Sequence, residues 1–367
     1  MRTILIAHNY TESSFAFMSY YLAHHLAFEG NKVIFISHRP FFRDPFEENI
    51  ENGQLLIYSW PTESRPVRIK DAFWFAKLYL KYKPTVVISH FVNVNITTIV
   101  SKILSLGKVK TFPYYHTLST QIQQDVSSST LKRNFKKYRK KLIYKWFADQ
   151  VICPSDLARE DFKNHFNCSN AIKVINPMRD RFKEKSKIES DFIIVSYLGR
   201  LESSKGVIDL INAFLEYKKK FLMSKIVLNI AGSGSQYDQI SRLAIDNPIV
   251  NFLGALPYNE IDEYLHKSHY TIIPSKFDAL NMVGIEAMMN QTPLLISNNT
   301  GLASELKDGA ECYKFDPMIE EMVMLFERVE NNFEKQNEMG IKARETFLKK
   351  FKVENYCKVI QKIIEIN

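Results

Sequence analysis

The sequence predicts an α/β protein with two domains, each built on a mostly parallel sheet. The chain has 367 residues, and at about 150 residues per domain this length favours two domains. Short β-prone runs alternate with amphipathic stretches, which is typical of βαβ units with right-handed crossovers. A polar, charged stretch without periodicity interrupts the alternation at 178–190 and separates two such series.

The first series begins with an apolar strand at 3–7, as expected for a strand that is buried on both faces of a parallel sheet. A helix at 15–28 follows and ends at Gly30, where a strand at 32–37 begins. Later strands are predicted at 55–58, 85–89, 109–115, 150–153 and 172–175, with helices at 71–82 and from about 131.

The second series begins with a strand at 192–198 and a helix at 207–220. Its later strands are predicted at 225–231, 250–253, 270–273 and 293–297, and the tail at 347–366 is helical in pattern. The predicted organisation is therefore an N-terminal domain at 1–177, a linker at 178–190, a second domain at 191–346 and a C-terminal helix at 347–367.

Composition excludes several classes of protein. No apolar run approaches the roughly 18 residues of a membrane-spanning helix, and the apolar stretch at 3–7 is too short for a secretory signal, so we expect a cytoplasmic protein. The four cysteines form no C-x-x-C pair, which argues against a zinc site. Basic residues exceed acidic ones by 49 to 40, and the excess lies in residues 1–180, which hold 25 basic and 14 acidic residues.

Ligands of open parallel sheets bind beyond the carboxyl ends of the strands, so the turns after the strands are the candidate sites. The turn after the strand at 192–198 contains Gly199, Arg200 and Lys205. Both cations suit a phosphate, and Lys205 lies just before a helix whose free N–H groups also favour an anion. A surface loop with two solvated cations is the alternative.

The next two turns are less specific. A Gly-x-Gly turn that contains Gly232 follows the strand at 225–231, but such turns are common for steric reasons alone. Phe252 and Leu253 end the following strand, at a place where a planar group could pack.

The segment at 274–288 carries two carboxylates on either side of a predicted helix start. Asp278 precedes the helix and Glu286 lies about one turn inside it, so N–H groups of the helix N-terminus lie between them. Acids on both sides of an anion site can bind hydroxyls of a sugar and a ribose. A capping Asp with a solvated Glu is the alternative.

In this order, the four segments resemble the donor-binding domain of retaining glycosyltransferases of family 4, over about 196–311. The first domain is similar more loosely, at 147–155 and 174–177. The resemblance implies a GT-B fold with two facing Rossmann-like domains and a C-terminal helix that crosses back to the first domain.

The resemblance also implies roles for individual residues. Arg200 and Lys205 match the pair that neutralises the diphosphate of the donor, and Glu286 matches the acid that holds the ribose. Asp278 stands where the family usually has Glu, next to the transferred sugar. The remaining donor-side residues are Gly199, Gly232, Phe252, Leu253, Asn281, Met282 and Val283, of which the last three replace a glycine-rich segment.

Two features of the first domain bear on the acceptor side. His116, after the strand at 109–115, matches the family's histidine near the sugar. The first loop departs from the family, because it has no paired glycines; Ser13 and Ser14 could still cap the following helix and offer N–H groups.

The segment at 131–146 is strongly basic and contains no acid. Leu131, Phe135, Tyr138, Leu142 and Trp146 recur at spacings of three or four, which places them on one face of a helix. Such a helix suits an anionic membrane surface, where Phe41, Phe42 and Trp60 could add anchoring. A helix docked on its own sheet is the alternative. No nucleic-acid partner is expected, because no recognised binding module accompanies the charge.

The sequence therefore predicts a retaining glycosyltransferase that uses a nucleotide-sugar donor and a lipid-linked or saccharide acceptor. It is expected to be cytoplasmic and peripheral at the inner face of a membrane. No D-x-D sequence occurs, so neither a metal nor another cofactor is expected. The alternatives are a same-fold enzyme with other chemistry, such as a nucleotide-sugar epimerase or a phosphorylase, and a non-catalytic two-lobed binding protein.

Overall fold

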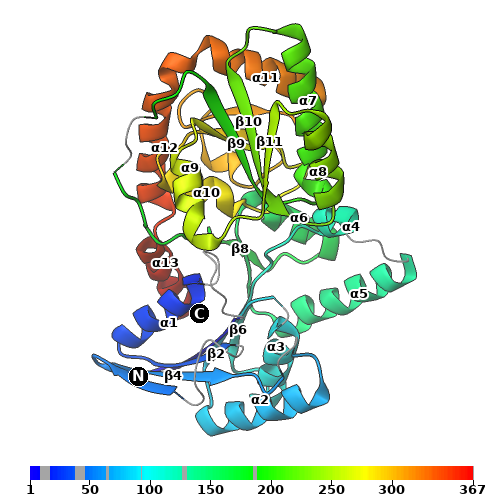
Figure 1. Ribbon diagram of the computed structural model, residues 1–367. Helices are drawn as coiled ribbons and strands as arrows, with labels where there is room; N and C mark the ends of the chain where they lie inside the picture. Colours follow the sequence, from blue (N-terminus) through cyan, green and yellow to red (C-terminus); the bar gives the residue numbers. More distant parts are fainter. Residues whose placement is uncertain are drawn as a thin grey trace. The chain divides into compact units, whose positions relative to one another are not determined.

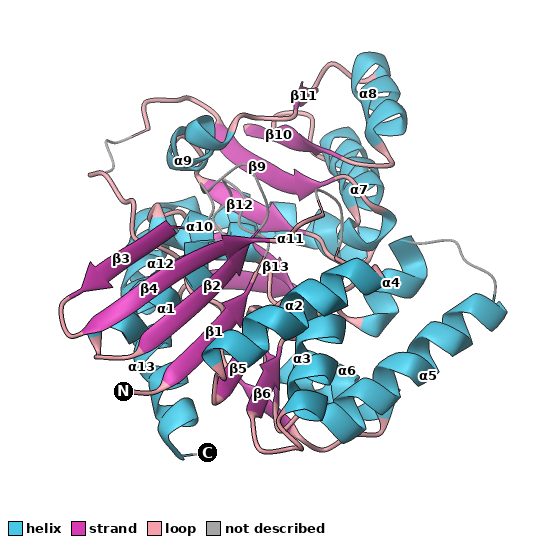
Figure 2. Ribbon diagram, turned by 90° about the horizontal axis from the view of Figure 1, so that it is seen from below, coloured by secondary structure: helices cyan, strands magenta, loops and turns pink. Residues whose placement is uncertain are grey.

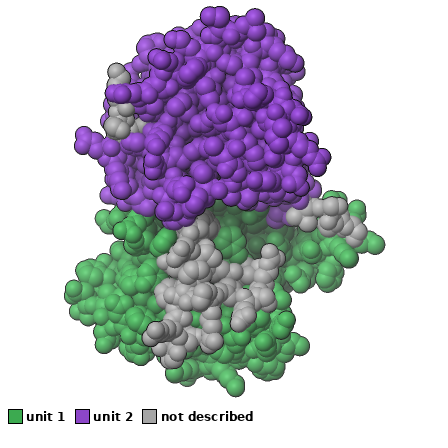
Figure 3. Space-filling model, viewed as in Figure 1, with its two compact units in different colours: residues 1–119, 128–179, 353–367 green, residues 120–127, 180–352 purple. Residues whose placement is uncertain are grey.

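The protein folds into two compact units, which Figure 3 colours separately. The structure is a computed structural model that describes residues 1–8, 17–37, 46–62, 66–91, 93–125, 130–184 and 188–366. The first unit comprises Met1–Ser119, Ser128–Arg179 and Val353–Asn367, and the second comprises Thr120–Ser127 and Asp180–Lys352. The sequence predicts residues 120–127 in the first domain, but their contacts group them with the second unit.

The first unit is built on a six-stranded sheet with the order β3-β4-β2-β1-β5-β6. Its strands are β1 (Thr3–Ala7), β2 (Lys32–Ser37), β3 (Phe46–Ile50), β4 (Gly53–Ser59), β5 (Val86–Ser89) and β6 (Lys110–Pro113). All neighbours pair in parallel except β3 and β4. The short strands β7 (Val151–Cys153) and β8 (Ala171–Lys173) form a separate parallel pair.

Helices cover both faces of this sheet, which explains why its central strands are apolar on both sides. The helices are α1 (Phe17–Phe28), α2 (Ile69–Tyr82), α3 (Asn93–Leu104), α5 (Thr130–Phe147), α6 (Asp156–Phe166) and α13 (Val353–Ile366). Alternate strand residues such as Ile4 and Ile6 pack with α1 and α13, whereas Leu5 and Ala7 pack with α2. Helices α2, α3 and α5 lie in sequence along one side in Figure 2.

The C-terminal helix α13 completes the core of the first unit. Tyr356, Ile360 and Ile364 are buried in the same cluster as Leu22 and Leu26 of α1. The Tyr356 and Tyr114 hydroxyls are 2.6 Å apart, and Arg2 donates to the Ile364 carbonyl at 2.8 Å. The crossing of the C-terminal helix to the first domain, implied by the family resemblance, is confirmed.

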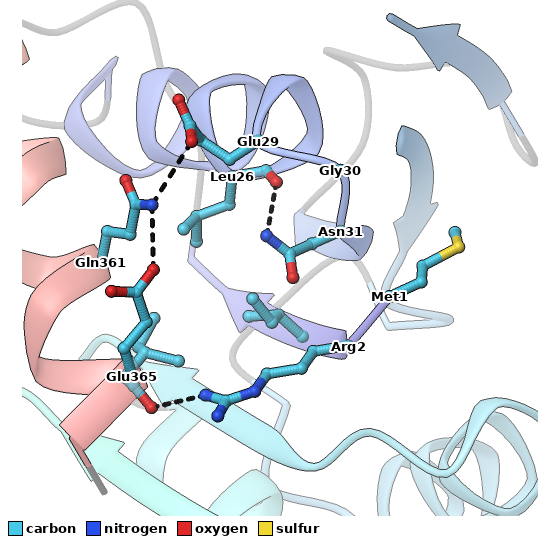
Figure 4. Close-up of a pocket in the computed structure, with 10 residues that line it drawn as sticks. Met1, Arg2, Leu26, Glu29, Gly30, Asn31, Gln361 and Glu365 are labelled. Atoms are coloured by element: carbon cyan, nitrogen blue, oxygen red, sulfur yellow. Dashed lines mark hydrogen bonds between the residues drawn. The ribbon is translucent and has the colours of Figure 1, made fainter. Parts of the chain in front are cut away.

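A pocket of about 260 Å³ lies where α13 meets β1 and α1 (Figure 4). Gln361 bridges Glu29 and Glu365 across it, and Asn31 donates to the Leu26 carbonyl. The pocket opens at the amino ends of β1 and β2. Ligands of such sheets bind at the opposite edge, so this pocket is a packing seam rather than the candidate site.

The second unit has an all-parallel six-stranded sheet with the order β11-β10-β9-β12-β13-β14. Its strands are β9 (Ile193–Arg200), β10 (Ile226–Ser233), β11 (Val250–Gly254), β12 (Tyr270–Ile273), β13 (Leu294–Ser297) and β14 (Cys312–Phe315). Its helices are α7 (Val207–Lys220), α8 (Tyr237–Asp246), α9 (Ile261–His266), α10 (Met282–Met289), α11 (Ile319–Asn331) and α12 (Gln336–Lys350), joined by α4 (Ser119–Asp125) from the first half of the chain.

The core of the second unit lies between the sheet and the helices α7, α8 and α11, which group around β9, β10 and β11 in Figure 1. Phe214 and Phe326 pack their rings at 5.5 Å within it. The strand order reverses between β9 and β12, so the loops that follow these two neighbouring strands leave the sheet in the region where ligands of such folds bind.

Candidate functional site

Four predicted turns follow β9, β10, β11 and β12, which are contiguous and parallel in the second unit. Their carboxyl ends therefore share one edge of the sheet. The chain after β9 and the chain after β12 flank the point where the strand order reverses. The two cations lie at the end of β9 and just after it, and the two carboxylates lie in the loop after β12 and in α10. The structure thus places Arg200, Lys205, Asp278 and Glu286 at one edge of the second sheet, and it brings Lys205 into contact with Asp278.

The loop after β9 is fixed to the loop after β12 by backbone contacts. The Lys276 N–H donates to the Ser204 carbonyl at 2.8 Å. Gly206 has a left-handed φ of 69°, and a Cβ atom there would lie 2.3 Å from the Pro274 carbonyl oxygen. Only glycine allows this close approach, which sets where α7 begins relative to Lys205.

Lys205 and Asp278 form a buried ion pair across these loops. The Asp278 carboxylate also accepts from the Asn281 side chain at 2.9 Å and from the Leu280 N–H at 3.4 Å. Burial raises the pKa of Asp278, but the Lys205 charge and these hydrogen bonds outweigh that effect and hold the pKa below its ordinary value. The carboxylate is therefore ionised at neutral pH.

Asn281 links the two carboxylate positions through the start of α10. It has a φ of 78°, which is unusual for a residue other than glycine, and its side chain accepts from the Gly284 N–H at 2.7 Å as a helix cap. The same amide donates to Asp278, so one side chain orders both the carboxylate and the helix N-terminus. Met282 and Val283 form the first turn of this helix.

Arg200 differs from Lys205 in its exposure. Its side chain is 58% exposed, and its guanidinium lies 4.0 Å from the Asp125 carboxylate. Asp125 also accepts from the Ser204 N–H at 3.0 Å and from the Ser204 hydroxyl at 2.8 Å. An anionic group is thus already bound at the loop that carries the two cations. The sequence reading missed Asp125, because it is 75 positions away along the chain.

The sequence predicts Gly232 in a turn after β10, but β10 runs on to Ser233 and Gly232 pairs with Gly199 inside the sheet. The glycines at this strand end have a steric explanation. A Cβ atom on Gly232 would lie 1.9 Å from the Gly199 carbonyl oxygen, and one on Gly234 would lie 2.5 Å from the Leu201 carbonyl oxygen. The glycines let β10 run against the strand end that presents Arg200. Within β11, the Phe252 ring packs on Tyr237 with ring centroids 5.1 Å apart, and Leu253 is exposed on this edge strand.

Glu286 lies in the second turn of α10 and is buried. Its Oε1 atom is 3.4 Å from Nη2 of Arg181, a residue of the predicted linker. The sequence predicts Glu286 at this helix but does not indicate Arg181, because a single arginine in a polar stretch carries no local signal.

His116 belongs to a row of histidines in the first unit. His8, His90 and His116 follow β1, β5 and β6, and the rings of the last two lie 5.2 Å apart and nearly parallel. His90 contacts His116 Nε2 through Nδ1 at 2.9 Å and Ser19 through Nε2 at 3.1 Å, and Ser19 also contacts His8. Burial lowers the pKa of all three rings, that of His8 to about 3, so they are neutral at pH 7.

A neutral histidine carries one ring N–H, so the two hydrogen bonds of His90 run in the same direction. The tautomer of His116 is therefore coupled to Ser19 through His90. Of these three histidines, the sequence analysis predicts a site role for His116 alone. The others have the same signal, because His8 and His90 each come directly after a buried strand. Ser13 and Ser14 lie outside the described residues.

The basic helix α5 is docked at one end only. Ile143 and Tyr144 are buried, whereas every residue from 131 to 139 is exposed. The predicted apolar face is largely solvent-exposed, with Leu131 at 83% and Trp146 at 69%. Trp60 is 1% exposed, so the suggestion that it anchors the protein to a membrane is wrong; Phe41 and Phe42 lie outside the described residues.

Within the part of the chain that the structure describes, no group of three or more His, Cys, Asp or Glu side chains has the geometry to hold a metal ion. In the same residues, no helix is both long and apolar enough to cross a bilayer.

Comparison with known proteins identifies the family. A model described as Glycosyl transferases group 1 matches residues 178–346, and one described as Glycosyltransferase Family 4 matches residues 17–181. A glycosyltransferase of Haemophilus influenzae is 26% identical over 332 residues, covering 88% of each chain. The chain spans less of other relatives: 60% of a Methanocaldococcus jannaschii glycosyltransferase at 24% identity, and 28% of Mycobacterium tuberculosis glycogen synthase at 33% identity.

Solved structures agree on the fold. Sucrose-phosphate synthase from Thermosynechococcus elongatus aligns with a TM-score of 0.78 at 16% identity, covering 100% of this chain and 98% of that one. Anabaena HepE in complex with UDP-glucose aligns with a TM-score of 0.73 at 14% identity, covering 100% of both chains. With two family models that together run from residue 17 to residue 346, the chain belongs to the group 1 glycosyltransferases of family 4 type, with the GT-B fold.

Proposed function

We propose that the chain is a retaining glycosyltransferase that moves a sugar from a nucleotide-sugar donor to an acceptor hydroxyl. The observation that carries this proposal is the placement of Arg200 and Lys205, beside the start of α7, at the strand-order reversal of the second unit. When the bond from the anomeric carbon to the diphosphate oxygen breaks, negative charge grows on the diphosphate. Fixed cations stabilise that charge more than they stabilise the bound donor.

The other residues of the edge would hold the remaining parts of the donor. In this proposal Glu286 accepts from the ribose hydroxyls and Asp278 from the transferred sugar. The N–H groups of Asn281, Met282 and Val283 face the diphosphate, and the backbone at Phe252 and Leu253 lies against the base. HepE was solved with UDP-glucose, which supports a nucleotide-sugar as the donor class. No metal or cofactor is invoked.

A thermal-shift screen over nucleoside diphosphates and nucleotide-sugars tests the donor. A ligand at a hundredfold excess over its dissociation constant should stabilise the protein by about 2.7 kcal/mol. With the donor identified, the product of transfer should keep the anomeric configuration of the donor. An inverted product, an epimerised sugar without transfer, or no stabilisation by any nucleotide would contradict the proposal.

His116 is proposed to donate or accept a hydrogen bond with the transferred sugar as a neutral ring. Replacing it by alanine should lower kcat/KM by about fivefold, which corresponds to the loss of one hydrogen bond of about 1 kcal/mol. His165→Ala, at another partly buried histidine of the first unit, is the matched control and should leave kcat/KM unchanged. Unchanged transfer by His116→Ala would remove this role.

The acceptor is proposed to be a lipid-linked or surface polysaccharide or glycolipid precursor, reached by a cytoplasmic protein at the inner face of a membrane. The support is the exposed first half of α5, which presents Leu131, Phe135 and Tyr138 among lysines and arginines. Ile69 and Phe73 of α2 are exposed as well, and α2 and α5 both pack against α3 (Figure 2). Mixed cationic and aromatic surfaces of this kind bind anionic lipid headgroups.

Vesicle co-sedimentation tests this surface. The wild-type protein should sediment with vesicles that contain phosphatidylglycerol and be released as salt rises. A Lys132→Gln, Lys136→Gln, Arg139→Gln variant should partition less by on the order of 100-fold, at about 1 kcal/mol per cation. Replacing Lys219, Lys225 and Lys335 of the second unit by glutamine removes the same charge and should have little effect. Sedimentation that is absent, insensitive to salt, or equally weakened by both variants would contradict a membrane role for α5.

A further inference from the structure

The predicted linker contributes an arginine to the interior of the second unit. Arg181 follows Asp180, the first residue of that unit after the linker begins. Its guanidinium binds Asp262 of α9 through Nε at 2.8 Å and through Nη2 at 2.9 Å. Its Cζ atom also lies over the Tyr258 ring, 5.4 Å from the ring centroid. Its own N–H donates to the Met289 sulfur at 3.3 Å. Arg181 is therefore held in one place from several sides.

The same guanidinium reaches Glu286. Nη2 lies 3.4 Å from Glu286 Oε1, and the side chain of Glu286 is 4% exposed. A buried carboxylate loses the stabilisation of bulk water, so a fixed positive charge beside it is needed to keep it ionised. An ionised carboxylate accepts hydrogen bonds only, which is what two donating hydroxyls of a diol require.

Asp262 determines how Arg181 is oriented. It receives a fork of two N–H groups from Arg181, and the Asn290 amide donates to Asp262 Oδ1 at 3.1 Å. Asn290 caps the end of α10, the helix that carries Glu286. Although burial alone would lower it, the pKa of Arg181 is raised above its ordinary value by Asp262, Tyr258 and Glu286. Arg181 is therefore the centre of an ion-pair network with Asp262 and Glu286.

We propose that Arg181 is a positioning residue for ribose recognition: it fixes the rotation and the charge of the Glu286 carboxylate so that Glu286 discriminates ribose from deoxyribose in a nucleoside diphosphate. The inference rests on the proposed function, which assigns the ribose to Glu286. It adds that the start of the second unit, not the donor loops alone, determines how selectively the nucleotide is bound.

The chain offers a matched control in the same segment. Arg344 of α12 forms a fork with Asp180, at 2.9 and 2.7 Å, and stacks on Phe182 at 4.4 Å. It is a similarly buried arginine that holds the same stretch of chain through Asp180 and Phe182 rather than through Glu286. Loss of Arg344 therefore reports the effect of loosening the linker, separately from any effect on Glu286.

The experiment measures dissociation constants of the full-length protein by calorimetry for UDP, GDP, ADP and CDP, for their 2′-deoxy counterparts, and for inorganic pyrophosphate. For the best-bound base, the wild type should prefer the ribonucleotide by tenfold or more, as expected for hydrogen bonds to a charged group, at about 1.5–3 kcal/mol. Arg181→Met should reduce this preference to about threefold or less, while the affinity for pyrophosphate changes by less than about twofold. Arg344→Met should keep the wild-type preference.

Two further variants separate the possible failures. Glu286→Gln should abolish the preference; if it does not, the ribose assignment of the proposed function is wrong. If Glu286→Gln abolishes it and Arg181→Met does not, the positioning role of Arg181 is overturned. Equal losses in Arg181→Met and Arg344→Met, with weaker pyrophosphate binding, would also overturn it. Arg181→Lys keeps the positive charge and therefore tests whether the effect of Arg181→Met comes only from misfolding. A single ammonium cannot replace both the fork to Asp262 and the contact with Glu286. The preference for the ribonucleotide should therefore still fall at least about threefold in Arg181→Lys.

Discussion

Lys205→Met is expected to lower both the turnover and the stability of the protein. Turnover should fall by about 10²–10³, the usual effect of removing one group that stabilises charge in a transition state. The free energy of unfolding should fall by about 3–5 kcal/mol, because the substitution leaves the buried Asp278 carboxylate without its ion-pair partner. Urea denaturation and a donor-turnover assay measure the two effects separately.

The pH dependence of the unfolding free energy tests the contribution of this ion pair. The pKa of Asp278 is lower in the folded protein than in the unfolded chain, so the pair stabilises the protein above about pH 4 and this contribution disappears as the pH falls through the folded pKa. The difference in unfolding free energy between wild type and Lys205→Met should therefore shrink in acid.

Two further variants show whether the losses come from the Lys205–Asp278 pair itself. Lys205→Met combined with Asp278→Asn removes the unpaired charge and should regain stability but not turnover. Lys276 lies in the same segment as Asp278 and forms an ion pair with Asp209 in which both side chains are about one-third exposed. Lys276→Met breaks this pair and should change turnover by no more than about threefold. A stable, active Lys205→Met variant would show that the buried pair serves neither purpose.

The strands of the second unit were largely predictable, because each apolar run carries its own pattern, whereas α8, α9, α11 and most of α12 were not predicted. The strands missed are those whose stability comes from their neighbours. β3 is the polar sequence Phe46–Ile50 and is held as an antiparallel edge by β4. β14, at Cys312–Phe315, is a four-residue strand that pairs with β13. The predicted tail helix at 347–366 is interrupted at Phe351, which is fully buried between α12 and α13.

The residues of the candidate site also fall into a group that the sequence predicts and a group that it does not. Arg200, Lys205, Asp278 and Glu286 follow strands of one parallel sheet, and this topology alone predicts that they share an edge. Asp125, Arg181 and the row of histidines come from distant parts of the chain, and only the folded structure shows what each contacts. The residues proposed to contact the donor were visible in the sequence, whereas Asp125 and Arg181, which the structure places beside them, were not.

The Gly-x-Gly turn after β10 provides the second strong prediction. Gly232→Ala is expected to destabilise the protein by about 2–5 kcal/mol, because its Cβ atom would lie 1.9 Å from the Gly199 carbonyl oxygen and the backbone φ of 155° is unfavourable for other residues. The strand end that presents Arg200 must move to relieve the clash. Nucleotide binding should therefore weaken even at temperatures where the variant stays folded.

Gly309→Ala separates the steric clash from backbone strain. Gly309 also has a positive φ, of 74°, but no atom lies within 4 Å of the position of its Cβ. This variant should lose about 1–2 kcal/mol, from strain alone, and should bind nucleotide normally. If the two variants lose the same stability by urea denaturation, close packing against Gly199 does not explain the turn. If Gly232→Ala binds nucleotide as the wild type does, the position of Gly199 and Arg200 does not depend on β10. The steric account of these glycines would then be wrong.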